Sequence, residues 1–113
     1  MNDIRNDVVK AKDLNGRQFN NFTSNFYVIK SALRYYSVNQ GLSFTASKIG
    51  DEFPVSVPAA GSSLKILSDL GVVESRNDSS SANRYMPDNV DLEKLLQVED
   101  ILIEQLELEE FNK

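Results

Sequence analysis

Hydrophobic residues recur at helical spacing along most of the chain, most clearly between residues 56 and 71. Ser56 precedes this segment with a hydroxyl that can accept a hydrogen bond from a first-turn N–H group, and Gly71 can take the left-handed conformation that ends a helix. At about 100° per residue, the pattern predicts a helix with a buried face and a presented face. The apolar stripe consists of Val57, Ala60, Leu64, Leu67 and Leu70, and the opposite face of Pro58, Ser62, Lys65 and Asp69.

Two further helices are predicted before this one. The first runs from Ser24 to about Asn39, and its Lys30 and Arg34 are interpreted as part of a solvated face. After Gly41 and a very short strand over residues 42–44, Thr45 is positioned to cap a second helix that Pro54 stops. Two helices joined by a three-residue turn are typical of a helix-turn-helix. The inward residues of the two helices are Phe26, Ile29, Ala32, Leu33, Tyr36, Ile49 and Phe53.

A β-hairpin is predicted after Gly71. The chain reads VVESR, then the polar turn-forming segment NDSSSAN, then RYMP, with Arg76 and Arg84 at the neck of the hairpin. The serine-rich stretch 79–81 is interpreted as its tip. These elements together predict a mainly α fold with a small β-hairpin.

The first 22 residues leave two interpretations open. Ile4, Val8 and Ala11 sit at helical spacing, which favours a short helix over residues 3–14. The pair Asn15-Gly16 is also a strong two-residue turn signal, so a hairpin between DVVKAKDL and RQFNNF is the alternative.

The last segment is predicted to form a long helix to about Glu110, with Asp88 and Asn89 as possible caps after Pro87. Its apolar stripe is broader than one helix normally buries in a small domain, so a homodimer is predicted through this helix. Glu99 interrupts the stripe as a bend, a rim position or a partner for a cation of the second chain. The predicted dimer interface consists of Leu92, Leu95, Leu96, Leu102, Ile103 and Leu106.

The composition of the chain limits the kinds of functional site that it can form. With 113 residues, of which 41% are hydrophobic, the chain has the size of one compact domain. It contains neither cysteine nor histidine, which removes disulfides, thiol nucleophiles, imidazole bases and most metal-ligand sets. No signal-peptide pattern or long apolar run is present, so we expect a cytoplasmic protein without a membrane partner, a cofactor or a metal.

Charge is distributed unevenly. Residues 1–86 carry ten Lys/Arg and eight Asp/Glu, or +2, whereas residues 87–113 carry two and nine, or −7, which gives the net charge of −5. The acidity therefore belongs to the final segment, and the slightly basic remainder keeps a nucleic-acid partner possible.

The run from Ser63 to Val73, SLKILSDLGVV, followed by Arg76 and then Arg84-Tyr85, resembles the recognition helix and wing of winged helix-turn-helix transcriptional regulators of the ArsR/MarR-like superfamily. The resemblance covers residues 24–87. It implies an N-terminal extension over residues 1–22, a DNA-binding domain over residues 23–87 and an acidic dimerisation helix over residues 88–113. The fold class is then α+β, a winged helix with a long C-terminal helix.

The resemblance also implies roles for individual residues. Thr45, Ser47 and Lys48 are expected to meet phosphates, and the helix that follows is expected to face the major groove. Arg76 and Arg84 are expected to place the wing on the DNA backbone or in the minor groove. The groove-facing residues of the helix are Ser56, Val57, Pro58, Ser62 and Lys65.

Two features depart from such regulators. The presented face of this helix has few base-reading groups, and Asp69, near its far end, is expected to point away from the groove. The ligands needed for metal sensing are absent. A winged helix that binds a protein instead of DNA is therefore the alternative.

Catalysis has little support in the sequence. Ser62-Ser63-Leu64-Lys65 matches the S-x-x-K spacing of serine acyl-enzymes, but the companion signatures are missing. No phosphate-binding or dinucleotide-binding glycine pattern is present. The sequence therefore predicts a DNA-binding regulator that is not an enzyme.

Overall fold

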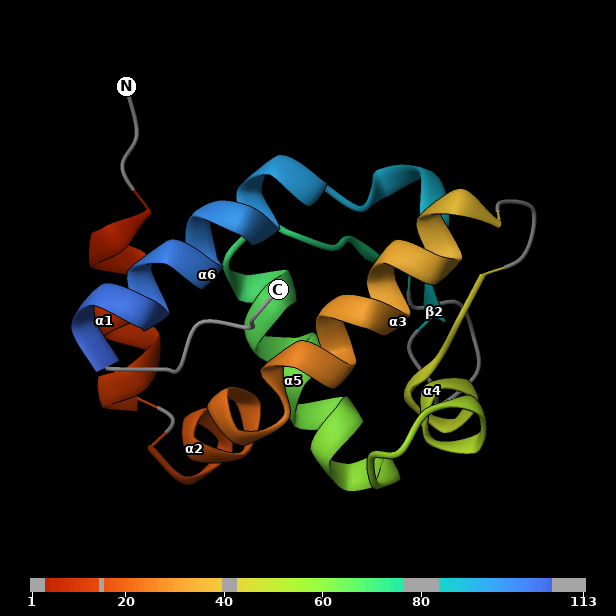
Figure 1. The fold of residues 1–113 in the computed structure, drawn as a ribbon, viewed down its shortest axis with the longest axis horizontal. Helices are drawn as coiled ribbons and strands as arrows, with labels where there is room; N and C mark the ends of the chain where they lie inside the picture. Colours follow the sequence, from red (N-terminus) through yellow and green to blue (C-terminus); the bar gives the residue numbers. More distant parts are fainter. Residues whose placement is uncertain (1–3, 15, 40–42, 77–83, 107–113) are drawn as a thin grey trace.

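The computed structural model describes residues 4–14, 16–39, 43–76 and 84–106. Over these residues the chain is mainly helical with a small β-hairpin, as predicted. Figure 1 shows α5 crossing the middle of the molecule, with α4 and β2 on one side and α1 and α6 on the other. The elements are α1 (Arg5–Leu14), α2 (Gly16–Ser24), α3 (Phe26–Val38), α4 (Ala46–Glu52), α5 (Val57–Asp69), β1 (Ser75–Arg76), β2 (Arg84–Tyr85), the 3-10 helix η1 (Pro87–Asn89) and α6 (Leu92–Leu106).

The ends of α4 and α5 follow local signals in the sequence. The Thr45 hydroxyl accepts a hydrogen bond from the Lys48 N–H at 3.1 Å, and the Ser56 hydroxyl accepts one from the Ala59 N–H at 3.2 Å. Both side chains satisfy donors that a first helical turn leaves unpaired. Gly71 has a φ of +82°, which confirms the predicted left-handed stop after α5.

A glycine allows α4 and α5 to pack closely. A Cβ atom on Gly50 would lie 2.6 Å from Val57 Cγ2 and 3.4 Å from the Val57 backbone. Such a contact is too short for two carbon atoms, so Val57 occupies its present place against α4 because residue 50 has no Cβ atom.

The hairpin is short and is extended by one residue from before α4. Ser75 pairs with Tyr85 and Arg76 with Arg84 in antiparallel register. Phe44 adds an isolated bridge to Tyr85, with both N–H···O distances at 2.9 Å. The very short strand predicted over residues 42–44 is thus confirmed at Phe44, while the predicted tip over residues 77–83 lies outside the described residues.

The N-terminal segment is helical, so the hairpin alternative is wrong. The structure confirms a helix in the predicted place, α1, and adds α2, which the sequence did not indicate. Phe19, Phe22 and Phe26 form an edge-to-face aromatic series, and α2 packs against α5. Residues before the proposed DNA-binding domain therefore contribute to the same hydrophobic core, as do Ile4 and Val8.

Helix α6 packs against its own chain. Asp91 Oδ1 accepts a hydrogen bond from the Lys94 N–H at 2.9 Å, so Asp91 caps this helix and the segment from Pro87 to Asn89 forms the separate 3-10 turn η1. The predicted cap at Asp88 or Asn89 is wrong because that turn precedes the helix. Four residues of α6 lie in the core, namely Leu95, Val98, Ile101 and Leu102.

An ion pair holds α6 against α3. Lys30 Nζ lies 2.6 Å from Glu99 Oε1, and their side chains are only 17% and 10% exposed. The interpretation of Lys30 as a solvated cation is therefore wrong. Glu99 does have a cation as its partner, and that cation belongs to the same chain.

Candidate nucleic-acid interface

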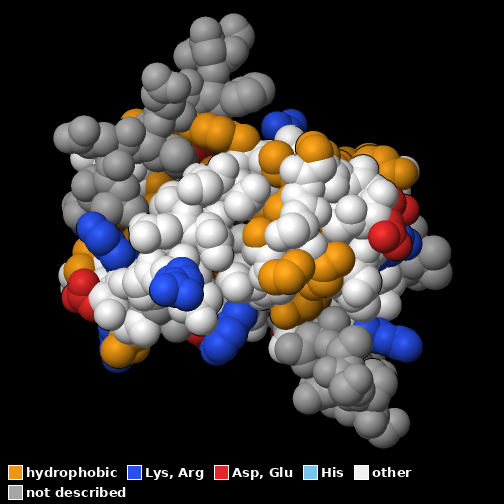
Figure 2. All heavy atoms as spheres, turned by 90° about the horizontal axis from the view of Figure 1, so that it is seen from below, with side chains coloured by type: hydrophobic (Ala, Val, Ile, Leu, Met, Phe, Trp, Pro, Cys, Tyr) orange, Lys and Arg blue, Asp and Glu red, His pale blue; other side chains and the backbone are white. Residues whose placement is uncertain are grey.

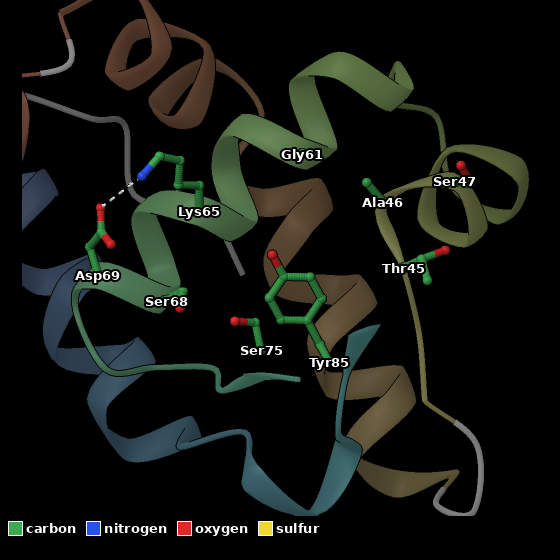
Figure 3. A pocket seen from close by; sticks show the side chains of 9 residues that line it. All are labelled: Thr45, Ala46, Ser47, Gly61, Lys65, Ser68, Asp69, Ser75 and Tyr85. Atoms are coloured by element: carbon green, nitrogen blue, oxygen red, sulfur yellow. Dashed lines mark ion pairs between the residues drawn. The ribbon is translucent and has the colours of Figure 1, made fainter. Parts of the chain in front are cut away.

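A polar hollow of about 480 Å³ lies between α5, the start of α4 and the hairpin. Figure 3 shows the Tyr85 ring between the hairpin and α5, with Lys65 and Asp69 directed toward one another at one end of the hollow and Thr45 and Ser47 at the other end. Hydroxyl groups dominate its lining, so it can donate several hydrogen bonds to a ligand rich in acceptors. The lining residues are Thr45, Ala46, Ser47, Gly61, Lys65, Ser68, Asp69, Ser75 and Tyr85.

Lys65 and Asp69 carry the charge of this hollow. Lys65 Nζ lies 3.7 Å from Asp69 Oδ2, one helical turn further along α5, and the two side chains are 71% and 53% exposed. Asp69, which was expected to point away from the DNA groove, lines the hollow beside Lys65. Helical geometry explains this placement because residues four apart lie on the same face of a helix.

The start of α4 holds three residues that were predicted to meet phosphates, and two of them line the hollow. Thr45 and Ser47 line the hollow. Lys48, in contrast, places its ammonium 5.7 Å from the centre of the Tyr36 ring. A cation above an aromatic face is held by the quadrupole of the ring, so Lys48 has a partner within the chain.

Tyr36 connects this part of α4 to the core. Its ring stacks on Phe44 with the centroids 4.8 Å apart, and its hydroxyl donates to Glu52. Burial of the phenol, together with its hydrogen bond to the Glu52 carboxylate, raises the pKa of Tyr36 well above the ordinary tyrosine value. Tyr36 therefore remains a neutral donor that fixes the end of α4.

The first turn of α5 presents Ser56, Val57 and Pro58 at the surface, with Ser62 partly exposed one turn later. Val57 was assigned to the buried stripe, yet 41% of it is exposed, because it lies beside Gly50 at the edge of the α4–α5 contact. Figure 2 shows the side of the molecule at which α5 begins, where hydrophobic side chains gather near the middle and Lys and Arg side chains are scattered around them.

The hairpin contributes Ser75, which was not predicted, and Tyr85, which belongs to the run that carries the resemblance but had no predicted role. Ser75 and Tyr85 line the hollow, and Tyr85 stacks on Phe44 with the centroids 5.8 Å apart. Arg84 is exposed on β2, and Arg76 lies opposite it in the register of the hairpin. Ser68, on α5, also lines the hollow and was not predicted, although its place near Lys65 on the helix was a usable signal.

The predicted dimer residues divide into two groups. Leu95 and Leu102 lie in the core of their own chain, so they do not form a free apolar surface in this structure. Leu96 is 50% exposed, and Leu92 and Ile103 are partly buried. The side chain of Leu106 lies outside the described residues. Intrachain packing thus accounts for much of the broad stripe, and the dimer stays a prediction.

The described part of the chain shows neither a metal site nor a membrane-spanning helix. No three acidic side chains among these residues come together in an arrangement that holds a metal ion. Within the same ranges, every helix is too short or too polar to cross a membrane.

Comparisons with protein-family models, with curated proteins and with solved structures found no match for this chain.

Proposed function

We propose that the chain binds duplex DNA as a winged helix-turn-helix transcriptional regulator, with α5 as its recognition helix. The order of elements supports this assignment: α3, the Phe44 bridge, α4, α5 and then the hairpin. An α-helix fits the major groove of B-DNA, and helices of this class contact base edges with their first residues. On α5 these are Ser56, Val57 and Pro58, which are all exposed.

The observation that carries the proposal is the hydroxyl-lined hollow around Lys65, between α5 and the hairpin. A helix in the major groove has phosphates on both sides, and hydroxyl, backbone and ammonium donors on the protein position the duplex through them. Ser68 of α5 and Ser75 of the hairpin line the hollow with Lys65, and Thr45 and Ser47 line it at the start of α4. Arg84 adds an exposed cation on the hairpin.

The direct test is selection of binding sites from random duplexes, followed by titration in increasing salt. We expect an enriched sequence and an affinity that falls with salt, because binding to phosphates releases counterions. Lys65→Ala and Arg84→Ala should each weaken binding and reduce the salt slope by about one. Lys12→Ala, which removes an exposed cation on α1, is the matched control and should change little. Without an enriched sequence, or with a dissociation constant of about 10⁻⁴ M near physiological salt, the proposal fails.

We propose that the regulator acts as a homodimer through the exposed side of α6. Two copies double the number of recognition helices, and a two-fold dimer matches half-sites about 34–36 Å apart. Leu96, with the partly buried Leu92 and Ile103, provides the apolar contact. Leu96→Glu should then shift light scattering at micromolar concentrations from dimer to monomer, whereas Val38→Glu, at another exposed apolar position on α3, should not. A wild-type monomer would contradict the dimer.

A protein partner is the second candidate function. The exposed Pro54, Val57 and Pro58 at the start of α5 favour it, because an apolar surface suits a protein more than a phosphate backbone. Changing Lys65, Arg76 and Arg84 together to alanine separates the two candidates. Retention on DNA should collapse if the chain is a DNA-binding regulator, whereas pull-down of a protein partner should survive if it is an interaction module.

A further inference from the structure

Asp69 places a negative charge in a hollow that is proposed to bind DNA phosphates. Of the described residues that line the hollow, Lys65 and Asp69 alone carry a charge at neutral pH. The Asp69 carboxylate lies 3.7 Å from the Lys65 ammonium and faces the same space. A phosphate that approached Lys65 would therefore meet a carboxylate of its own sign.

Interactions within α5 itself give little reason for an acid at this position. Asp69 is the last residue of α5, where the negative end of the helix dipole disfavours a carboxylate. A lysine four residues before an acid is also the weaker orientation for an ion pair within a helix. Because both side chains are more than half exposed, the pair contributes little to folding.

We propose that Asp69 is a built-in competitor that occupies Lys65 until a backbone phosphate of duplex DNA displaces it. This inference rests on the proposed function and concerns the regulation of the same site. A phosphate brings more acceptor oxygens than the carboxylate. The hydroxyl-bearing residues Ser68 and Ser75 line the same hollow as Lys65 and Asp69. The exchange keeps contacts with the backbone weak, so stable binding requires further contacts from α5 and the hairpin.

Asp69→Asn tests the competition with fluorescence anisotropy on a labelled mixed-sequence duplex. The amide keeps the shape of the side chain and removes its charge. We expect binding to tighten about five-fold, because the phosphate no longer has to replace the attraction between two opposite charges about 4 Å apart in a hydrated site. The salt slope should change little, because Lys65 neutralises one phosphate in both proteins once the duplex is bound.

Asp100→Asn is the matched control because it removes the same charge from an exposed position on α6, away from the hollow. It should change affinity by less than about two-fold, since exposed charges more than a Debye length apart are screened. An equal gain in both variants would overturn the proposal, because net charge alone would then explain it. Circular dichroism of each variant checks that the fold is intact.

The role of Lys65 is tested by repeating the change in a Lys65→Met background. If Asp69 acts by holding Lys65, most of the five-fold gain should disappear there. A full gain without Lys65 overturns the competition, and so does unchanged or weaker binding of Asp69→Asn when the wild-type protein binds the duplex. Absence of binding in every variant would instead remove the proposed function itself.

Discussion

Two ion pairs in this molecule have similar chemistry and opposite surroundings. Lys30 and Glu99 join α3 to α6 at 2.6 Å, with side chains 17% and 10% exposed. Lys65 and Asp69 lie on one helix at 3.7 Å, with side chains 71% and 53% exposed. Water surrounds the second pair and is mostly excluded from the first.

The difference separates a contact that maintains the fold from a contact that a ligand can replace. Removing one partner of a buried pair leaves an uncompensated charge in a poorly solvated place, which costs several kcal/mol. Removing one partner of an exposed pair leaves a charge that water solvates. The Lys30–Glu99 pair is thus suited to holding α6 against α3. The Lys65–Asp69 pair is suited to exchange with an anion.

The largest effect is expected for Lys30→Met. Methionine fills much of the same volume but leaves the Glu99 carboxylate buried without its cation, so the free energy of unfolding should fall by about 3 kcal/mol. Urea unfolding followed by circular dichroism measures this change. A loss below about 1 kcal/mol, within the range of exposed pairs, would remove the distinction between the two pairs.

The matched rescue is Glu99→Leu in the Lys30→Met background. With both charges gone, an apolar pair of similar volume should recover about 2 kcal/mol of the loss, since well-packed apolar residues often replace buried ion pairs without cost. If the double variant is no more stable than Lys30→Met alone, the stability lost with Lys30 came from packing of its stem and not from an isolated charge.

Two glycines extend the comparison to the packing of α5. On the packed side, Gly50→Ala adds a Cβ atom 2.6 Å from Val57 Cγ2, and we expect a net loss of about 1 kcal/mol after the gain in helix propensity. On the side of the hollow, Gly61→Ala places its Cβ atom 3.8 Å from Ala46 Cβ, an ordinary contact. That variant should gain about 0.5–1 kcal/mol.

Chemical unfolding of both glycine variants measures these opposite signs. The Gly50→Ala/Val57→Ala double variant should recover part of the loss, because it removes the methyl group that the new Cβ atom meets. Equal effects of Gly50→Ala and Gly61→Ala would show that the two contacts between α4 and α5 are packed alike.

Local signals were enough to predict where α4 and α5 begin and where α5 ends. Thr45, Ser56 and Gly71 act on backbone groups within a few residues, so their roles are visible in the sequence. Helix α2 was missed because Asn15-Gly16 is a strong turn signal. Its helical form is supported by burial of Phe19 and Phe22 in the core, which depends on contacts distant in the chain.

Contacts between residues distant in the chain also explain why the packing of the C-terminal helix was predicted wrongly. No spacing rule connects Lys30 with Glu99, which are 69 residues apart, so the acid looked like a defect in an apolar stripe. For the candidate site, helical spacing and the resemblance selected Thr45, Ser47 and Lys65, and the structure brings these three to one hollow. Ser75 and Tyr85 join them only because the hairpin folds back beside α5.

The smallest effect on stability is expected for Lys65→Met, which applies to the exposed pair the same substitution as Lys30→Met. Water can solvate the remaining Asp69 carboxylate, so the free energy of unfolding should change by less than about 0.5 kcal/mol. Urea unfolding of Lys65→Met and Lys30→Met provides the direct comparison. Fluorescence anisotropy should also show that Lys65→Met binds duplex DNA more weakly than the wild-type protein. A loss of stability near that of Lys30→Met would mean that the Lys65–Asp69 pair supports the fold, and that a phosphate could not displace it at low cost.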